Sequence, residues 1–138
     1  MPNDNPIDLL ARTLFSETKS IDDAIAIAHV IQNRLARPKR FGDTYEKVIY
    51  APKQFSGVGT QEWEKAEKKR FNQQERQIYE AFKNIALGVQ GGVIPDPTGG
   101  ADHYYNPEIS NPSWGKIFPE TYKTKFHRYL KETTKKKK

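Results

Sequence analysis

The sequence predicts a mainly α fold, and three segments carry that prediction. Over residues 7–17, apolar side chains recur with the i, i+3, i+4, i+7 spacing of one helix face. Residues 24–35 are apolar almost all round, as in a helix that is buried on every side. Residues 73–87 carry another apolar stripe at helical spacing, and Gly88 is a natural C-terminal stop for it. A chain of 138 residues is long enough to bury these faces in one core.

The first predicted helix ends with an acid on its apolar side. Leu10, Leu14 and Glu17 lie on one stripe, so the Glu17 carboxyl group ends the apolar face and not the solvent face. Apolar neighbours disfavour a charged carboxylate, so such a group holds its proton more readily. A carboxylic acid that stays protonated near neutral pH can act as general acid on a glycosidic bond. The alternative for this stretch alone is a rim glutamate that extends into water.

The second predicted helix should be the most buried one. Ser20 is a suitable N-cap, and Asp22 and Asp23 fall in the first turn, where the helix dipole favours acids. The helix should end before Pro38, because the residue before a proline avoids the α region. His29 lies inside this helix, and we expect it to be a core histidine with a hydrogen-bond partner.

Shorter elements are expected in the rest of the chain. Residues 44–50 favour a short helix, and the charged residues 62–70 favour a solvated one. Residues 52–59 form a loop marked by Pro and Gly, where polar side chains often meet a ligand. The alternation over residues 101–105 favours a short strand.

Composition and charge limit the possible classes of protein. The 23 Lys and Arg residues exceed the 17 Asp and Glu residues, which gives a net charge of +6. Such a surface favours a polyanion, either nucleic acid, anionic lipid or an anionic cell-wall polymer, although it also serves plain solubility. The absence of cysteine excludes a disulfide framework, a thiolate metal site and a thiol nucleophile.

We expect a single catalytic domain over residues 1–134 and a disordered basic tail over residues 135–138. No internal repeat or second domain is visible, and no apolar run reaches the length of a membrane span. The first residues lack the pattern of a secretory signal. We therefore expect a protein that stays in the cytoplasm, leaves by another route, or is trimmed.

Five short motifs occur in the order found in one enzyme family. They are Ala11–Leu14 with Glu17, Ile31–Arg34, Gln54–Ser56, Gly100–Pro107 and Phe126–Tyr129. With this ordered set the chain resembles the cell wall hydrolase family of the spore cortex-lytic enzymes, relatives of the lytic transglycosylases in the lysozyme superfamily. The resemblance covers roughly residues 7–130. It implies a lysozyme-like, lytic-transglycosylase-like single domain with a short β or irregular segment.

The resemblance also implies a set of site residues, with Glu17 as the catalytic glutamate. The implied substrate-binding residues are Gln54, Phe55, Ser56, His103, Tyr104, Tyr105, Asn106 and His127. Relatives often carry a second glutamate just after the first, which this chain lacks. Asp102 stands where a small or hydroxyl residue is expected. No metal and no cofactor are implied.

The implied activity is cleavage of the MurNAc–GlcNAc β-1,4 bond of peptidoglycan. Hydrolysis in the usual manner requires two carboxyl groups. A lytic transglycosylase needs one acid, which protonates the bond and then accepts the proton of the muramic acid 6-hydroxyl as the ring closes. No other acid has a sequence context comparable to Glu17; those considered are Asp22, Asp23, Asp96, Asp102 and Glu108. A single-acid lytic transglycosylase is therefore our leading hypothesis, in the setting of a phage endolysin or virion lysin, or of a trimmed bacterial domain.

Three alternatives stay open at this point. A hydrolytic muramidase would use Asp102 or a bound water beside Glu17. A zinc amidase would use His29, His103 and His127 with Glu17, although no pair of them has metal-binding spacing. A nucleic-acid-binding domain would use the basic surface and the aromatic side chains. We expect a monomer that binds peptidoglycan glycan strands, with basic residues attracted to the anionic wall, and no nucleic acid.

Overall fold

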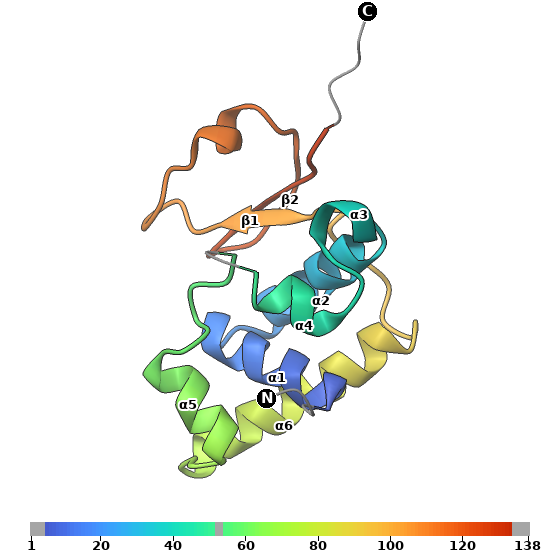
Figure 1. The fold of residues 1–138 in the computed structure, drawn as a ribbon. Helices are drawn as coiled ribbons and strands as arrows, with labels where there is room; N and C mark the ends of the chain where they lie inside the picture. The colour runs from blue at the N-terminus through green and yellow to red at the C-terminus, as the bar shows by residue number, and fades with distance from the viewer. Residues whose placement is uncertain (1–4, 52–53, 134–138) are drawn as a thin grey trace, which may run out of the picture.

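The computed structural model describes residues 5–51 and 54–133, and in this part the predicted mainly α fold is confirmed (Figure 1). The helices are α1 (Pro6–Glu17), α2 (Ile21–Leu35), α3 (Pro38–Phe41), α4 (Tyr45–Ile49), α5 (Gln61–Lys68), α6 (Gln73–Gln90) and the short 3₁₀ helix η1 (Ser113–Lys116). The strands are β1 (His103–Tyr105), β2 (Glu120–Lys123) and β3 (Arg128–Leu130). The sheet lies at one end of the helical part of the molecule. The predicted tail over residues 135–138 lies outside the described residues.

The first two helices each begin directly after a side-chain cap, and the cap of α2 is the predicted Ser20. The Asn5 side chain accepts a hydrogen bond from the N–H of Ile7 at 2.8 Å and caps α1. Ser20 caps α2 by accepting from the N–H of Asp23 at 3.3 Å. Between these two caps the chain leaves α1 in an extended conformation at Thr18, so Glu17 stands at the very end of the helix.

The core lies where α1, α2 and α6 pack together. Every side chain from Leu9 to Phe15 is buried, and so are all of residues 24–31 except the partly buried Ile25. The burial of α2 is therefore confirmed, but its expected rank as the most buried helix is not, because α1 is buried to a similar degree. His29 in α2 is 8% exposed, and its Nε2 lies 2.9 Å from the carbonyl oxygen of Ile94, so the expected core histidine with a partner is also confirmed.

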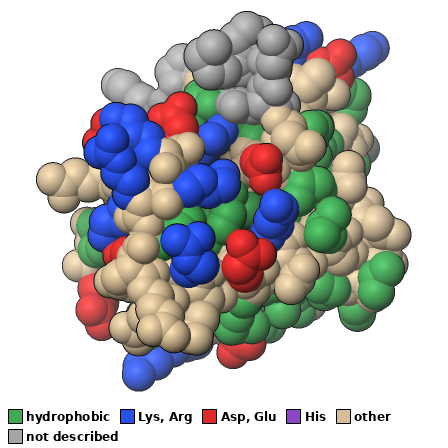
Figure 2. Space-filling view, turned by 90° about the horizontal axis from the view of Figure 1, so that it is seen from below, with side chains coloured by type: hydrophobic (Ala, Val, Ile, Leu, Met, Phe, Trp, Pro, Cys, Tyr) green, Lys and Arg blue, Asp and Glu red, His purple; other side chains and the backbone are tan. Residues whose placement is uncertain are grey.

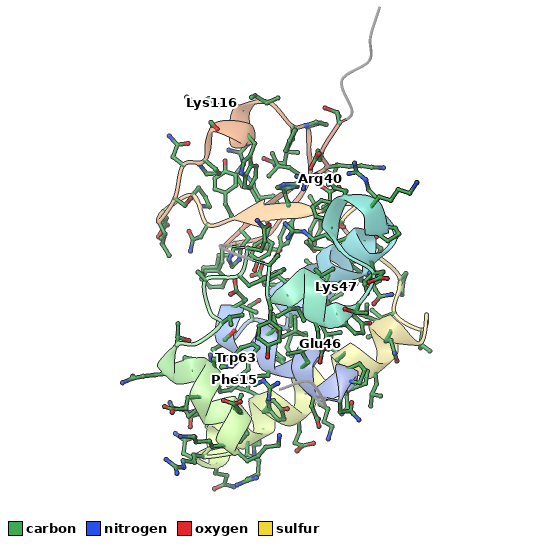
Figure 3. All side chains as sticks on the ribbon, viewed as in Figure 1. Phe15, Arg40, Glu46, Lys47, Trp63 and Lys116 are labelled. Carbon is green, nitrogen blue, oxygen red and sulfur yellow. The ribbon has the colours of Figure 1, made fainter. Side chains whose placement is uncertain are left out.

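Two helix predictions need correction. The helix predicted over residues 62–70 is α5, and it is not fully solvated, because Trp63 and Ala66 are buried against α1. Figure 3 shows Trp63 and Phe15 among the helices. The helix α6 does not stop at Gly88 but continues to Gln90. A Cβ atom at Gly88 would lie 2.6 Å from Cδ1 of Ile94, so this glycine makes room for the returning chain instead of ending the helix.

The sheet is antiparallel, with the strand order β1-β3-β2. His103 pairs with Leu130, and Tyr104 pairs with Tyr129. The predicted strand within residues 101–105 is confirmed as β1, whereas the strands β2 and β3 and the short helices α3 and η1 were not predicted. Because α2 and β1 are in contact, the sheet is held against the buried helix. Within the described residues, no helix has the length and apolar character needed to cross a membrane.

Candidate active site

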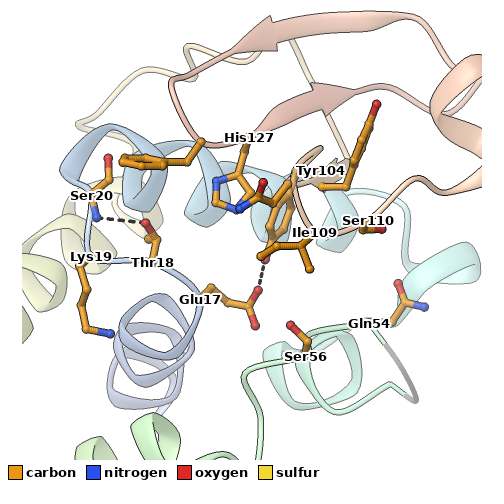
Figure 4. A pocket seen from close by; sticks show the side chains of 13 residues that line it. Glu17, Thr18, Lys19, Ser20, Gln54, Ser56, Tyr104, Ile109, Ser110 and His127 are labelled. Atoms are coloured by element: carbon orange, nitrogen blue, oxygen red, sulfur yellow. Dashed lines mark hydrogen bonds between the residues drawn. The ribbon is translucent and has the colours of Figure 1, made fainter.

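A cleft of about 700 Å³ opens between the end of α1 and the sheet (Figure 4). Its walls come from four segments: the turn after α1, the loop beginning at residue 54, β1 with the loop that follows it, and the turn before β3. The lining residues are Glu17, Thr18, Lys19, Ser20, Gln54, Ser56, Tyr104, Tyr105, Asn106, Ile109, Ser110, Phe126 and His127. Among the described residues that line this cleft, Glu17 is the one acid.

The Glu17 carboxyl group is half-buried, and each of its oxygens has a donor. The Tyr104 hydroxyl donates to Oε1 at 2.5 Å, and the backbone N–H of Gly57 donates to Oε2 at 2.6 Å. These donors come from β1 and from the loop before α5, so the carboxyl group is fixed from two sides. Figure 4 shows the Tyr104 contact across the cleft.

Gly57 shapes the site, although no sequence motif predicted a role for it. Gly57 is buried, and a Cβ atom there would lie 2.4 Å from Oγ of Ser16 and 2.7 Å from Oε2 of Glu17. Real Cβ atoms do not approach other atoms so closely, so any larger residue must displace the carboxyl group. The signal in the sequence was the glycine directly after the Gln54–Ser56 motif.

Tyr104 is held as a hydrogen-bond donor. Burial raises the pKa of its hydroxyl well above the ordinary value, and the charge of the adjacent Glu17 raises it further. The ring is stacked on Tyr129 at 5.7 Å between centroids and meets the His127 ring edge-on at 5.3 Å. The hydroxyl group therefore keeps its proton and points it at Glu17.

Gln54 is oriented by an arginine that comes from the buried helix α2. Arg34 is 4% exposed, and its Nη1 donates to Oε1 of Gln54 at 2.8 Å. Its Nε donates to the backbone carbonyl of Asp102 at 2.8 Å, so one guanidinium group links the loop to the sheet. Sequence reasoning placed Arg34 in a family motif but gave it no part in the site.

The predicted site residues divide into two groups. Six of the eight predicted substrate-binding residues line the cleft: Gln54, Ser56, Tyr104, Tyr105, Asn106 and His127. Phe55 and His103 are not among its lining residues, which corrects their expected placement.

Phe55 and His103 face the interior for different reasons. Phe55 is 5% exposed and packs in the core against Tyr104. Successive residues of a strand point to opposite faces, so His103 points away from the face on which Tyr104 meets Glu17. Tyr105 lies on the same face as His103 but, as the last residue of β1, still lines the cleft. The His103 ring lies against Trp114 at 4.8 Å, and its Nδ1 lies 2.9 Å from Oδ1 of Asp102.

The other acids considered from the sequence do not line the cleft. Asp102 is 2% exposed and forms an ion pair with Arg37 at 3.0 Å. Asp96 accepts hydrogen bonds from Thr98 and Asn33 in the turn before β1. The remaining candidates, Asp22, Asp23 and Glu108, are also absent from the lining residues. Among the described residues no three acid or histidine side chains come together in the arrangement of a metal site.

The sequence model that describes the cell wall hydrolase family matches residues 18–130. The chain belongs to this family. The match covers most of the chain and begins one residue after Glu17, so the glutamate at the end of α1 directly precedes it. Membership of the cell wall hydrolase family confirms the resemblance that the ordered motifs indicated.

Individual relatives of this cell wall hydrolase agree with the family match. The spore cortex-lytic enzyme of Halalkalibacterium halodurans is 30% identical over 118 residues, which cover 81% of this chain and 30% of the relative. The spore cortex-lytic enzyme of Bacillus cereus is 29% identical over 133 residues, which cover 92% of this chain and 44% of the relative. The chain therefore spans less than half the length of these curated relatives.

Two solved structures share the fold. The catalytic domain of the germination-specific lytic transglycosylase SleB from Bacillus anthracis superposes with a TM-score of 0.69 at 27% identity, covering 95% of this chain and 100% of that domain. The catalytic domain of the Bacillus cereus SleB protein gives 0.70 at 28% identity, covering 95% of each chain. The predicted lysozyme-like fold with a short β segment is confirmed.

Proposed function

We propose that this protein is a peptidoglycan-cleaving lytic transglycosylase in which Glu17 is the catalytic acid. One observation carries the proposal: Glu17 is the one acid among the described residues that line the cleft, and two donors fix it there. Membership of the cell wall hydrolase family and the likeness to two SleB catalytic domains support the same activity.

The proposed reaction uses Glu17 twice. Protonated Glu17 gives its proton to the glycosidic oxygen between MurNAc and GlcNAc, so the C1–O bond breaks and an oxocarbenium-like centre develops. The Glu17 carboxylate then takes the proton of the MurNAc 6-hydroxyl while that oxygen bonds to C1. The product carries a 1,6-anhydro ring, and Glu17 ends the cycle protonated. Tyr104 and Gly57 donate to the carboxylate that exists between the two steps.

The remaining cleft residues suit a sugar polymer. Gln54, Ser56 and Asn106 offer polar groups, and Tyr105 and Phe126 offer aromatic side chains. Sugar rings present hydroxyl and amide groups at their edges and C–H groups on their faces, so a cleft with both kinds of surface can bind them. We propose these residues as substrate-binding groups around Glu17.

A hydrolytic muramidase is the competing activity, and the placement of Asp102 does not favour it. A second carboxyl group would have to face the same bond as Glu17. Asp102 is buried, paired with Arg37 and absent from the cleft lining. Mass analysis of fragments from purified peptidoglycan separates the two activities, because the anhydro product is lighter than the hydrolysed one by one water.

We propose that charge attraction to an anionic wall is a secondary contribution. Figure 2 shows the face of the molecule seen from below in the view of Figure 1, where Lys and Arg side chains lie among Asp and Glu side chains. In α5, for example, Lys68 pairs with Glu64 at 2.9 Å and Lys65 pairs with Glu62 at 3.2 Å. The charges of such exposed pairs largely cancel, and each pair contributes little energy. The positive charge that is left over, +6 for the whole chain, would increase the rate of encounter with an anionic wall more than the affinity for it.

The test of the proposed function is Glu17→Gln. Glutamine keeps the shape of the side chain and can still accept the Gly57 hydrogen bond, but it cannot deliver a proton. We expect at least a hundredfold loss of wall-lytic activity, about the lower end of what a positioned acid supplies. Folding and binding to glycan should persist.

The matched control for this experiment is Glu64→Gln, because Glu64 is an exposed glutamate in α5 that does not line the cleft. It should leave lysis unchanged. If purified and folded Glu17→Gln protein lyses walls at nearly the wild-type rate, the single-acid mechanism and the assignment of Glu17 are both wrong.

A further inference from the structure

A buried carboxylate lies directly behind the wall that His127 forms in the cleft. Asp23, in the first turn of α2, is 0% exposed. Three side chains from β3 and the turn before it reach its Oδ1: Nδ1 of His127 at 3.0 Å, Oγ1 of Thr124 at 2.6 Å and the hydroxyl of Tyr129 at 2.5 Å. Its Oδ2 is buried and has no hydrogen-bond partner among the described residues. The hydrogen bonds of the Asp23 side chain therefore all go to this cluster of His127, Thr124 and Tyr129.

The direction of these hydrogen bonds follows from the charge of Asp23. Burial raises the pKa of Asp23, but the hydrogen bonds from His127, Thr124 and Tyr129 outweigh burial and hold the pKa below its ordinary value. Burial, and then the Asp23 hydrogen bond, raise the pKa of Tyr129. Asp23 is thus an ionised acceptor, and Tyr129 and Thr124 are donors to it.

An ionised carboxylate can only accept, so the His127 nitrogen that faces it must carry a hydrogen. That nitrogen is Nδ1, and the two ring nitrogens lie on different edges of the imidazole. His127 is 9% exposed and lines the cleft (Figure 4). Because Nδ1 is taken by Asp23, Nε2 is the ring nitrogen left for a ligand in the cleft. The rings of Tyr104 and Tyr129, at 5.3 Å and 6.2 Å, hold the imidazole in this orientation.

The needs of the helix do not explain the buried position of Asp23. Ser20 already caps α2, and the neighbouring Asp22 supplies an acid to the first turn while its side chain stays exposed. The hydrogen bonds that Thr124 and Tyr129 donate to Asp23 would be enough to link α2 to the sheet. The contact that remains to be explained is the one to His127, which is also the member of the cluster that reaches the cleft.

We propose that Asp23 is a positioning residue that holds His127 with its proton on Nδ1, so that His127 Nε2 accepts a hydrogen bond from a hydroxyl or amide N–H of the bound glycan. This inference rests on the proposed function, since it takes the ligand to be an N-acetylated sugar chain. The N-acetyl group and the free hydroxyls of such a chain are donors that a neutral imidazole nitrogen can accept.

Nitrogen NMR on ¹⁵N-histidine-labelled protein tests the proposal directly. The sample is Glu17→Gln protein, which should bind without cleaving, measured alone and with a soluble GlcNAc–MurNAc oligosaccharide. The same protein with His127→Gln identifies the His127 signals among the three histidines. For the neutral ring we expect the proton on Nδ1 and not on Nε2 in the free protein, and a movement of the Nε2 signal when oligosaccharide is added.

Two outcomes of the NMR experiment would overturn the inference while leaving the proposed function intact. One is a neutral His127 ring in the free protein with its proton on Nε2. The other is an unmoved Nε2 signal while, in a second sample of the same protein labelled uniformly with ¹⁵N, backbone signals of Ser56 and Asn106 shift with saturating oligosaccharide. If no signal moves and wild-type protein releases no fragments from peptidoglycan, the proposed function fails and this inference fails with it.

Kinetics on the otherwise wild-type protein give a second, independent test. We expect Asp23→Asn to raise KM for the oligosaccharide about tenfold, with a smaller effect on kcat, and to give a mixture of His127 tautomers. Asp22→Asn is the matched control, one residue away and exposed, and should change neither. If Asp23→Asn does not fold, His127→Phe, at the cleft surface, should show the same rise in KM. A variant that is less stable but keeps the wild-type KM and tautomer would reduce Asp23 to a structural residue and overturn the proposal.

Discussion

At the scale of single residues, the proposed acid depends on a residue that has no side chain. The N–H of Gly57 lies 2.6 Å from Oε2 of Glu17, and the missing Cβ of Gly57 leaves the space that this oxygen and the Ser16 hydroxyl occupy. The hydrogen bond and the missing Cβ together allow the backbone of the loop at Gly57 to pack against the end of α1. The position of the carboxyl group is therefore set by the loop as much as by the helix that carries it.

This arrangement predicts that Gly57→Ala inactivates the protein without unfolding it. The new methyl group would meet two flexible side-chain ends, those of Ser16 and Glu17, which can move aside at modest cost. A displacement of the acid on the scale of about 1 Å can cost about a hundredfold in rate, so we expect a loss of that order in fragment release. Thermal unfolding should show only a small decrease in Tm.

Gly59→Ala is the control for the Gly57 variant, because Gly59 belongs to the same loop and has open space around it, with a positive φ of 84°. It should destabilise the loop by about 1 kcal/mol through backbone strain while leaving activity nearly unchanged. Equal losses of activity in the two variants would mean that loop strain, and not displacement of Glu17, is responsible.

The residue scale also shows what sequence reasoning could and could not find in the site. Glu17 was predictable because it ends an apolar stripe and belongs to a family motif. Gly57 was not, because a backbone donor carries no side-chain signature. Asp23 was explained by the helix start alone, since its partners Thr124 and Tyr129 are about a hundred residues away in the chain.

At the scale of elements, long apolar stripes and two short segments with a local signal, α4 and β1, were predictable, whereas elements defined by nonlocal pairing were not. The helices α1, α2 and α6 follow from local spacing and caps. Strands β2 and β3 have four and three residues, and only their pairing with each other and with β1 defines them. Gly88 was misinterpreted because a helix stop and a close approach both call for glycine, and only the position of Ile94 distinguishes them.

The Gly88 contact gives a prediction about the end of α6. Alanine is favoured over glycine inside a helix by about 1 kcal/mol, so Gly88→Ala would stabilise an unencumbered helix. Here the methyl group would press on Ile94, and overpacking of this kind costs about 1–3 kcal/mol. We therefore expect Gly88→Ala to lower the free energy of unfolding by about 1 kcal/mol.

A double-mutant cycle in urea isolates that contact. In an Ile94→Ala background the obstacle is gone, so Gly88→Ala should become stabilising. Additive effects of the two substitutions would show that Gly88 and Ile94 do not restrict each other and that the glycine has another role.

At the scale of the whole molecule, buried carboxylates join the sheet to the helices. Asp102, next to β1, accepts hydrogen bonds from His103 and from the N–H of Glu132 on one oxygen and pairs with Arg37 on the other. Asp23 joins α2 to Tyr129 of β3 in the same way. Because the cleft lies between the helical part and the sheet, we expect its geometry to depend on these links and therefore on the charge of the two acids.

These carboxylates predict how stability changes with pH. Burial raises the pKa of Asp102, but its hydrogen bonds from His103 and the Glu132 backbone, and its pairing with Arg37, outweigh burial and place the pKa below the ordinary 3.8. As the pH falls, the unfolded chain therefore binds its proton before the folded protein does. The contribution of Asp102 is complete well above pH 3.8 and decreases as the pH falls through that value and then through the lower native pKa. Asp23, whose native pKa is also lowered, acts with the same sign.

Asp102→Asn measures this contribution, because asparagine keeps the size of the side chain and has no such proton to bind. At pH 7 we expect the variant to be less stable than wild type by about 1.5–3 kcal/mol, the range for hydrogen bonds to a charged group. Urea unfolding at a series of pH values should show the difference shrinking as the pH falls below about 4, because only the wild type loses the contribution of this carboxylate. The exposed control Asp22→Asn should follow the wild-type curve. A difference between wild type and Asp102→Asn that stays constant from pH 7 to pH 3 would mean that Asp102 stabilises the sheet by shape and neutral hydrogen bonds, and not by its charge.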